Sequence, residues 1–177
     1  LPELELVAPL GEFRLYARFD LLATGGPGDP LVIVDWKTLR GERAPGYDFL
    51  QRRMQTRVYL YVLATAGAPY ADVDGDLDPA RGVMRYWLAN YPEQPWVDIG
   101  YGPAEHRADY ERLLAIAHDI ASRPDEAAFE KTADERHCAV CTYRTLCHRG
   151  AGSALVEGSS DAEARIMDLS DIQELEY

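Results

Sequence analysis

Val32-Ile33-Val34-Asp35-Trp36-Lys37-Thr38 is the stretch of sequence that decides the fold. Its apolar, β-branched start predicts a strand from Leu31 to Thr38 in a central position of a sheet. Asp35 and Lys37 are two residues apart in this strand, so their side chains point to the same face. Because unpaired charges are costly inside an apolar strand, this context favours a functional site over a surface salt bridge.

A second carboxylate, Asp20, ends the preceding apolar segment, one hairpin away. Asp20, Asp35 and the backbone carbonyl of Trp36 offer the hard oxygen ligands that Mg²⁺ or Mn²⁺ requires. Lys37 could orient an attacking water or stabilise the charge of a phosphoryl transition state. The residues therefore predict metal-dependent phosphodiester hydrolysis. The alternative is a strand end next to an ordinary ion pair.

The other segments predict a mixed α/β architecture. Strands are expected at 4–7, 13–22, 82–90 and 96–101, with turn clusters at 9–11 and 24–30. Helices are expected at about 49–66, with Asp48 as the N-cap, and at 103–122. The second helix has apolar residues at helical spacing as candidates for its buried face: Ala108, Leu113, Ile116, Ala117 and Ile120.

A polar stripe runs along the first predicted helix. Gln51, Gln55 and Tyr59 recur at i, i+4 and i+8 and so share one face. If this face turns toward the strand motif, Gln55 and Tyr59 can reach Lys37 or a substrate backbone. If it turns outward, it is a solvated helix face.

The charges are unevenly distributed along the chain, with one basic segment and one acidic segment. The formal net charge is −12, yet the segment 37–57 has six basic residues against two acidic ones. The segment 157–177 has seven acidic residues against one arginine. We therefore expect Arg40 and Arg52, together with Gln51, to contact a nucleic-acid backbone, and 151–177 to form an acidic tail.

All three cysteines of the chain lie within ten residues, as Cys138, Cys141 and Cys147. Such a cluster is more typical of metal ligation than of disulfides or of three separate core thiols. Three thiolates suit an iron–sulfur cluster that lacks its fourth ligand, or zinc completed by His137 or His148.

Length and composition fit one globular domain. The chain has 177 residues, of which 47% are hydrophobic and 27% charged. No apolar run approaches the roughly 18 residues of a membrane span, and no signal-peptide pattern opens the chain, so the predicted location is the cytoplasm. The chain begins with Leu1 and not with Met, which suggests part of a longer protein or a processed product.

Four motifs in order resemble one family. Phe19-Asp20-Leu21, Val34-Asp35-Trp36-Lys37-Thr38, Gln55-Thr-Arg-Val-Tyr59 and the C-x2-C-x5-C segment are similar to the RecB-like branch of the PD-(D/E)xK nuclease superfamily. More narrowly, they resemble its iron–sulfur members, which include AddB-type helicase–nucleases and CRISPR spacer-acquisition nucleases. Each motif is weak alone, but the shared order makes the combined signal strong.

The resemblance implies a restriction-endonuclease-like core: an α/β fold with a mixed central sheet flanked by helices, and a C-terminal cysteine-cluster segment. It implies Mg²⁺ or Mn²⁺ on Asp20 and Asp35, catalysis by Lys37 and support from Gln55 and Tyr59. The nuclease domain would span 1–150, including the cysteine segment 134–149. The resemblance also implies a [4Fe–4S] cluster on Cys138, Cys141 and Cys147 plus one distant upstream cysteine.

Two of the family's features are absent from this sequence. The family commonly has a metal-liganding His on an N-terminal helix, whereas no His precedes His106 here, and the fourth Cys is missing. We expect both to lie upstream of Leu1, in a segment that this chain lacks.

The leading hypothesis is a DNA exonuclease or endonuclease that acts on single strands or duplex ends in repair or recombination, beside a helicase or another subunit. A CRISPR adaptation nuclease is the second hypothesis within this class. A non-catalytic nucleic-acid-binding or scaffolding module on the same fold is the third. The presence of Asp20, Asp35 and Lys37 together disfavours it, since a binding module has no chemical need for all three.

Overall fold

The computed structural model describes residues 1–38, 43–71, 73, 75–134, 138, 141, 143–144 and 146–147. Arg40, His137, His148 and the predicted acidic tail 151–177 lie outside the described residues. No helix within the described ranges has the length and apolar character needed to cross a bilayer.

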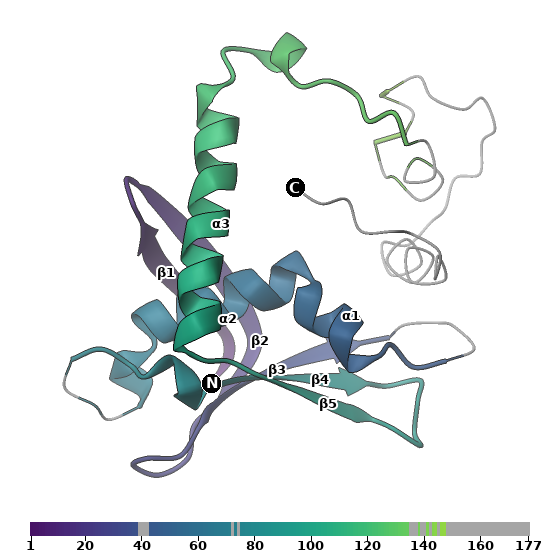
Figure 1. Cartoon of the computed structure of the whole chain (residues 1–177). Helices are drawn as coiled ribbons and strands as arrows, with labels where there is room; N and C mark the ends of the chain where they lie inside the picture. Colours follow the sequence, from purple (N-terminus) through teal and green to yellow (C-terminus); the bar gives the residue numbers. More distant parts are fainter. Residues whose placement is uncertain are drawn as a thin grey trace.

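One mixed sheet organises the described chain (Figure 1). Its strands lie in sequence order: β1 (Pro2–Leu10), β2 (Phe13–Ala23), β3 (Leu31–Lys37), β4 (Gly82–Leu88) and β5 (Trp96–Gly100). β3 and β4 are parallel, whereas the other neighbouring strands are antiparallel. A parallel pair requires a long crossover connection, and here the crossover contains α1 (Tyr47–Arg52) and α2 (Met54–Ala66). The sequence-based expectation of a mixed sheet flanked by helices is confirmed.

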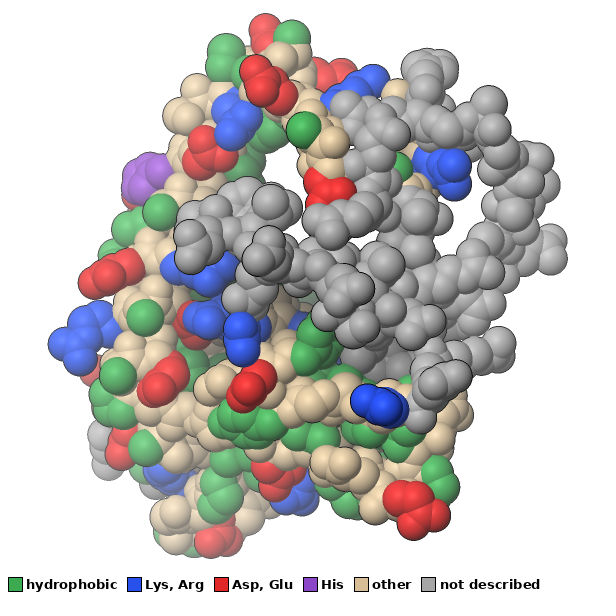
Figure 2. All heavy atoms as spheres, turned by 45° about the vertical axis from the view of Figure 1, so that its right-hand side comes forward, with side chains coloured by type: hydrophobic (Ala, Val, Ile, Leu, Met, Phe, Trp, Pro, Cys, Tyr) green, Lys and Arg blue, Asp and Glu red, His purple; other side chains and the backbone are tan. Residues whose placement is uncertain are grey.

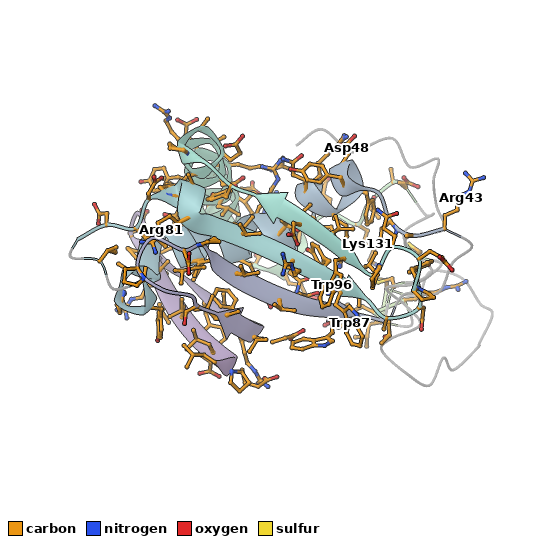
Figure 3. The ribbon with its side chains drawn as sticks, turned by 90° about the horizontal axis from the view of Figure 1, so that it is seen from below. Arg43, Asp48, Arg81, Trp87, Trp96 and Lys131 are labelled. Carbon is orange, nitrogen blue, oxygen red and sulfur yellow. The ribbon has the colours of Figure 1, made fainter. Side chains whose placement is uncertain are left out.

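The core lies between the sheet and the helices. Along β3 and β4, burial alternates residue by residue, as expected for a sheet with one covered face. The covered face contributes Phe19, Ile33 and Met84, which pack with Leu50 and Leu63 of the helices. The opposite face is open: Trp87 and Trp96 lie side by side there, with ring centroids 6.1 Å apart (Figure 3).

The helix expected at about 49–66 is two helices. Arg53 has an extended ψ of 136° and separates α1 from α2. The N-cap of α1 is Gly46, and Asp48, the expected cap, lies in the first turn, where its charge suits the helix dipole. The Thr56 hydroxyl donates to the Leu50 carbonyl at 2.5 Å and so stabilises the break, because the same carbonyl otherwise accepts the longer bond from the Arg53 backbone N–H, at 3.4 Å.

The last long helix, α3 (Pro103–Ser122), has the expected bounds, but its buried face differs from the expectation. Leu113 is buried, whereas Ala108 is exposed and Ile120 is 55% exposed. The helix packs on α2 and runs beside β1, and its His118 ring lies 5.3 Å from that of Phe13 at the start of β2, so the exposed Ile120 comes only in its last turn (Figure 1). The buried polar residue of this face is Asp109, which the apolar pattern did not include.

Candidate active site

The centre of the candidate site is a buried ion pair on the covered face of β3. Lys37 Nζ lies 2.8 Å from Asp35 Oδ2, and the two residues are 8% and 2% exposed. Burying both charges together keeps the cost of removing them from water tolerable. The alternation of β3 thus places the two side chains together, as the sequence predicted.

Gln55 bridges the two charges from the first turn of α2. Its Nε2 donates to Asp35 Oδ1 at 2.8 Å, and its Oε1 accepts from Lys37 Nζ at 3.0 Å. An amide presents a donor and an acceptor on one planar group, so it fits between a carboxylate and an ammonium. The structure therefore brings Gln55 of the predicted polar stripe into the site.

Asp20 lies beside this pair. Its Oδ2 accepts a hydrogen bond from the Trp36 backbone N–H at 3.1 Å, which fixes the carboxylate of β2 against β3 between Asp35 and Lys37. The indole ring of Trp36 is 42% exposed. The negative charge of Asp20 also raises the pKa of the Asp35 carboxyl, although by less than burial does.

Burial raises the pKa of Asp35 above its usual value, and the ammonium of Lys37 opposes this effect. Oδ2 of Asp35 is buried and faces the ammonium of Lys37 at 2.8 Å. A carboxylate oxygen has more than one lone pair, so Asp35 can also serve as a ligand of a divalent cation.

Tyr59 supports β2. Its hydroxyl donates to the Arg18 backbone carbonyl at 2.7 Å, and its ring packs edge-on against Phe19 at 5.1 Å between centroids. Both partners immediately precede Asp20. Burial raises the pKa of Tyr59, which keeps its hydroxyl protonated as a donor. Tyr59 thus fixes the strand that presents Asp20.

The other candidate residues of the polar stripe and basic segment are dispersed. The break at Arg53 removes Gln51 from the helix that carries Gln55, so the expected single face of three residues was wrong. Gln51 is half-buried, and Arg52 is exposed with its Nη2 4.0 Å from Asp48. Basic and acidic side chains are interspersed on the described surface in Figure 2.

Two buried residues near the site were absent from the sequence prediction. Thr56 and Tyr86 share a 2.6 Å hydrogen bond beneath the Asp35–Lys37 pair. Burial raises the pKa of Tyr86 to about 12. The alternation of buried and exposed residues in strand 82–88 could have predicted that Tyr86 is buried. Its position opposite Asp35, however, depends on the parallel register of β3 and β4.

The sequence of residues 2–148 matches the family model of the PD-(D/E)XK nuclease superfamily. The chain belongs to the PD-(D/E)XK nuclease superfamily. This membership agrees with the mixed sheet and places the chain among nucleases. None of the curated proteins matches the chain significantly.

Among solved structures, that of SSO0001 is similar, with a TM-score of 0.49 and 16% sequence identity. The similar region covers 83% of this chain and 59% of SSO0001. This chain therefore spans little more than half the length of that protein.

PD-(D/E)XK nucleases typically use Mg²⁺ or Mn²⁺, and the residues of this site fit such an ion. The donor set is of hard oxygens: the carboxylates of Asp20 and Asp35, with the Trp36 carbonyl adjacent in sequence. Within the described ranges, no group of three or more His, Cys, Asp or Glu residues is arranged to hold a metal. Two carboxylates are compatible with Mg²⁺, which usually retains several waters.

The cysteine segment fits a complete metal centre less well. Cys138 and Cys147 are half-buried, Cys141 is exposed, and all three are free thiols. Backbone bonds order this segment, including Cys147 N–H to the Tyr143 carbonyl at 3.1 Å, and Lys131 Nζ donates to the Cys147 carbonyl at 2.9 Å. The chain contains only three cysteines, so it cannot by itself supply the four thiolates of a [4Fe–4S] site.

Proposed function

We propose that this chain is the nuclease domain of a metal-dependent deoxyribonuclease of the RecB-like branch, acting on single strands or duplex ends in DNA repair or recombination. The observation that carries the proposal is the buried arrangement in which Gln55 bonds to both Asp35 and Lys37 while Lys37 Nζ lies 2.8 Å from Asp35 Oδ2. Asp20 beside it provides the second carboxylate. A purely structural ion pair would not require the additional acid.

In the proposed mechanism, Asp20, Asp35 and the Trp36 carbonyl would hold the divalent ion. When bound, the ion supplies Lewis-acid stabilisation of phosphoryl charge and a more acidic water. The ammonium of Lys37 lies beside the Asp35 carboxylate and would stabilise negative charge on the phosphate oxygens of the substrate. Gln55 limits the rotation of both Asp35 and Lys37, because one amide is bonded to each. This preorganisation lowers the cost of reaching the reactive geometry.

Cleavage of end-labelled DNA by variants of Lys37 tests this proposal. With Mg²⁺ or Mn²⁺ present, Lys37→Ala is expected to lower kcat by at least about 100-fold, the range typical for removal of a positioned electrostatic group. Arg85→Gln is the matched control, since Arg85 pairs with Asp98 outside the site, with both side chains partly exposed. Its kcat should equal that of the wild type. Cleavage that persists at the wild-type rate in Lys37→Ala would overturn the assignment.

The proposal also specifies the DNA substrate, namely single strands or duplex ends. Labelled single-stranded, blunt duplex and covalently closed circular DNA of one sequence separate the options. Degradation of linear single strands or of duplex ends is expected, with circles left intact by an exonuclease or cut by an endonuclease. Integration of short duplexes only in the presence of CRISPR adaptation proteins would favour the adaptation role instead of repair.

We also propose that Cys138, Cys141 and Cys147 ligate a [4Fe–4S] cluster whose fourth ligand comes from outside these 177 residues. The C-x2-C-x5-C spacing supports this proposal. Iron and acid-labile sulfide content, with a broad visible absorbance, should be present in anaerobically purified longer protein and lost in Cys141→Ser. Stoichiometric zinc without iron would contradict it and favour zinc completed by His137 or His148.

A further inference from the structure

The corner between α1 and α2 contains a buried chain of hydrogen bonds that the proposed catalysis does not use directly. Thr56 is 1% exposed, and its Oγ1 lies 2.5 Å from the Leu50 carbonyl and 2.6 Å from the Tyr86 hydroxyl. A threonine hydroxyl has one proton, and the Leu50 carbonyl can only accept it. The Tyr86 hydroxyl must therefore donate to Thr56, so the chain runs from Tyr86 through Thr56 to Leu50.

Two members of this chain, Thr56 and Tyr86, adjoin the candidate active site. Thr56 immediately follows Gln55, so any shift of the Thr56 backbone moves the amide that bridges Asp35 and Lys37. Tyr86 of β4 is the register partner of Asp35 in β3. Its ring also lies under the ammonium of Lys37, with Nζ 5.9 Å from the ring centroid.

The hydrogen bonds of Thr56 hold the first turn of α2 where the chain changes direction. Arg53, the N-cap of α2, makes no side-chain capping bond. The extended conformation of Arg53 leaves a change of direction just before Gln55. A buried hydroxyl with two fixed partners can hold such a corner, since its loss would remove the acceptor of the Tyr86 hydroxyl and leave the Leu50 carbonyl with the longer bond from the Arg53 backbone N–H, at 3.4 Å.

We propose that Thr56 and Tyr86 are positioning residues that hold Gln55 between Asp35 and Lys37, an inference that rests on the proposed nuclease function. They touch neither substrate nor metal. They act by fixing the start of α2 against β4, so that the Gln55 amide remains in register with both charges. Their contribution is therefore to turnover more than to DNA binding.

Steady-state cleavage by four folded variants tests this role. Thr56→Val keeps the shape but removes the hydroxyl, Thr56→Ser keeps the hydroxyl, and Tyr86→Phe removes only the donor. Thr65→Val is the matched control, since the Thr65 hydroxyl in the same helix bonds to the Tyr61 carbonyl, at 2.8 Å. Circular dichroism establishes that each variant is folded at the assay temperature.

Thr56→Val and Tyr86→Phe are expected to lower kcat by about 10- to 100-fold while KM for DNA changes by less than about 2-fold, the signature of misplaced catalytic groups. Thr56→Ser should recover kcat to within about 3-fold of the wild type, and Thr65→Val should match it. A folded Thr56→Val with wild-type kcat would overturn the proposal. So would a Thr56→Ser variant that is as slow as Thr56→Val.

A second readout separates this inference from the nuclease assignment. If the wild-type protein does not cleave DNA, the proposed function fails, but the position of Gln55 can still be measured. In nuclear magnetic resonance spectra, Thr56→Val should shift the Gln55 side-chain amide signals and speed their hydrogen exchange, whereas Thr65→Val should not. Unchanged Gln55 signals in Thr56→Val would refute the positioning role whatever the activity.

Discussion

The buried contact between α2 and α3 makes a quantitative prediction about stability. Asp109 of α3 is 2% exposed and accepts hydrogen bonds from Arg57 Nη1 at 2.5 Å and from the Tyr101 hydroxyl at 3.1 Å. Burial and the adjacent Asp109 carboxylate raise the pKa of Tyr101, which keeps Tyr101 a donor. Asp109→Asn removes the charge of this carboxylate and leaves Arg57 without its partner.

The size of the effect follows from burial. Breaking a buried ion pair costs about 3–5 kcal/mol. Because the Arg57 side chain is 25% exposed and can be partly rehydrated, we expect the lower end for Asp109→Asn, about 3 kcal/mol. For a domain of this length, that loss corresponds to a fall in Tm of about 6–12 °C.

Urea unfolding followed by circular dichroism measures this change, with the midpoint lowered and the m-value unchanged. Asp119→Asn in the same helix is the control. Asp119 pairs with Arg123 in an i,i+4 contact, but its side chain is 61% exposed, so its loss should cost less than about 0.5 kcal/mol. A cost for Asp109→Asn below about 1 kcal/mol, or equal to that of Asp119→Asn, would refute the reasoning.

Three further predictions concern the site and its frame. Since burial raises the pKa of Asp35, protons should compete with the metal ion for this carboxylate at pH values above those at which an ordinary aspartate titrates. Calorimetric Mn²⁺ affinity should therefore weaken as the pH is lowered, beginning at a higher pH than for an ordinary aspartate, and a constant affinity would contradict the role of Asp35. Tyr59→Phe loses the bond to the Arg18 carbonyl and should cost about 1 kcal/mol in urea unfolding, with slower cleavage, whereas wild-type values for both would disprove the support of β2. Gly67→Ala should destabilise the fold by about 2 kcal/mol, since the added Cβ would lie 2.4 Å from the Leu63 carbonyl oxygen. Gly100→Ala is the control, because a Cβ there meets no atom within 4 Å, and it should change stability by less than about 0.5 kcal/mol. Equal effects of the two substitutions would contradict the close approach at Gly67.

Local sequence patterns were sufficient for part of the site. Alternation in β3 placed Asp35 and Lys37 on one face, because that geometry is independent of the rest of the fold. Helical spacing also correctly assigned Gln55 to a helix near the strand motif. The fold class followed from the order of strands and helices and from the resemblance.

The remaining features depend on contacts between distant segments. The break at Arg53 was not predictable from helix propensity, because it is stabilised by Thr56 bonding back to Leu50. The position of Tyr86 against Asp35 requires the register of two parallel strands. Asp109 was omitted because a charged residue contradicts an apolar pattern, although its spacing of four from the buried Leu113 would have placed it on the same face.

The central claim is that Asp35 holds the divalent ion for phosphodiester hydrolysis. The most direct measurement is single-turnover cleavage of labelled single-stranded DNA by the wild type and by Asp35→Asn, with Mg²⁺, with Mn²⁺ and with a chelator. We predict cleavage by the wild type with either metal, none with the chelator, and a loss of at least about 1,000-fold in rate for folded Asp35→Asn, since two functions of the carboxylate, metal binding and orientation of Lys37, are lost together. Cleavage that persists with the chelator or in Asp35→Asn, or a wild type that is inactive with both metals, would contradict this account.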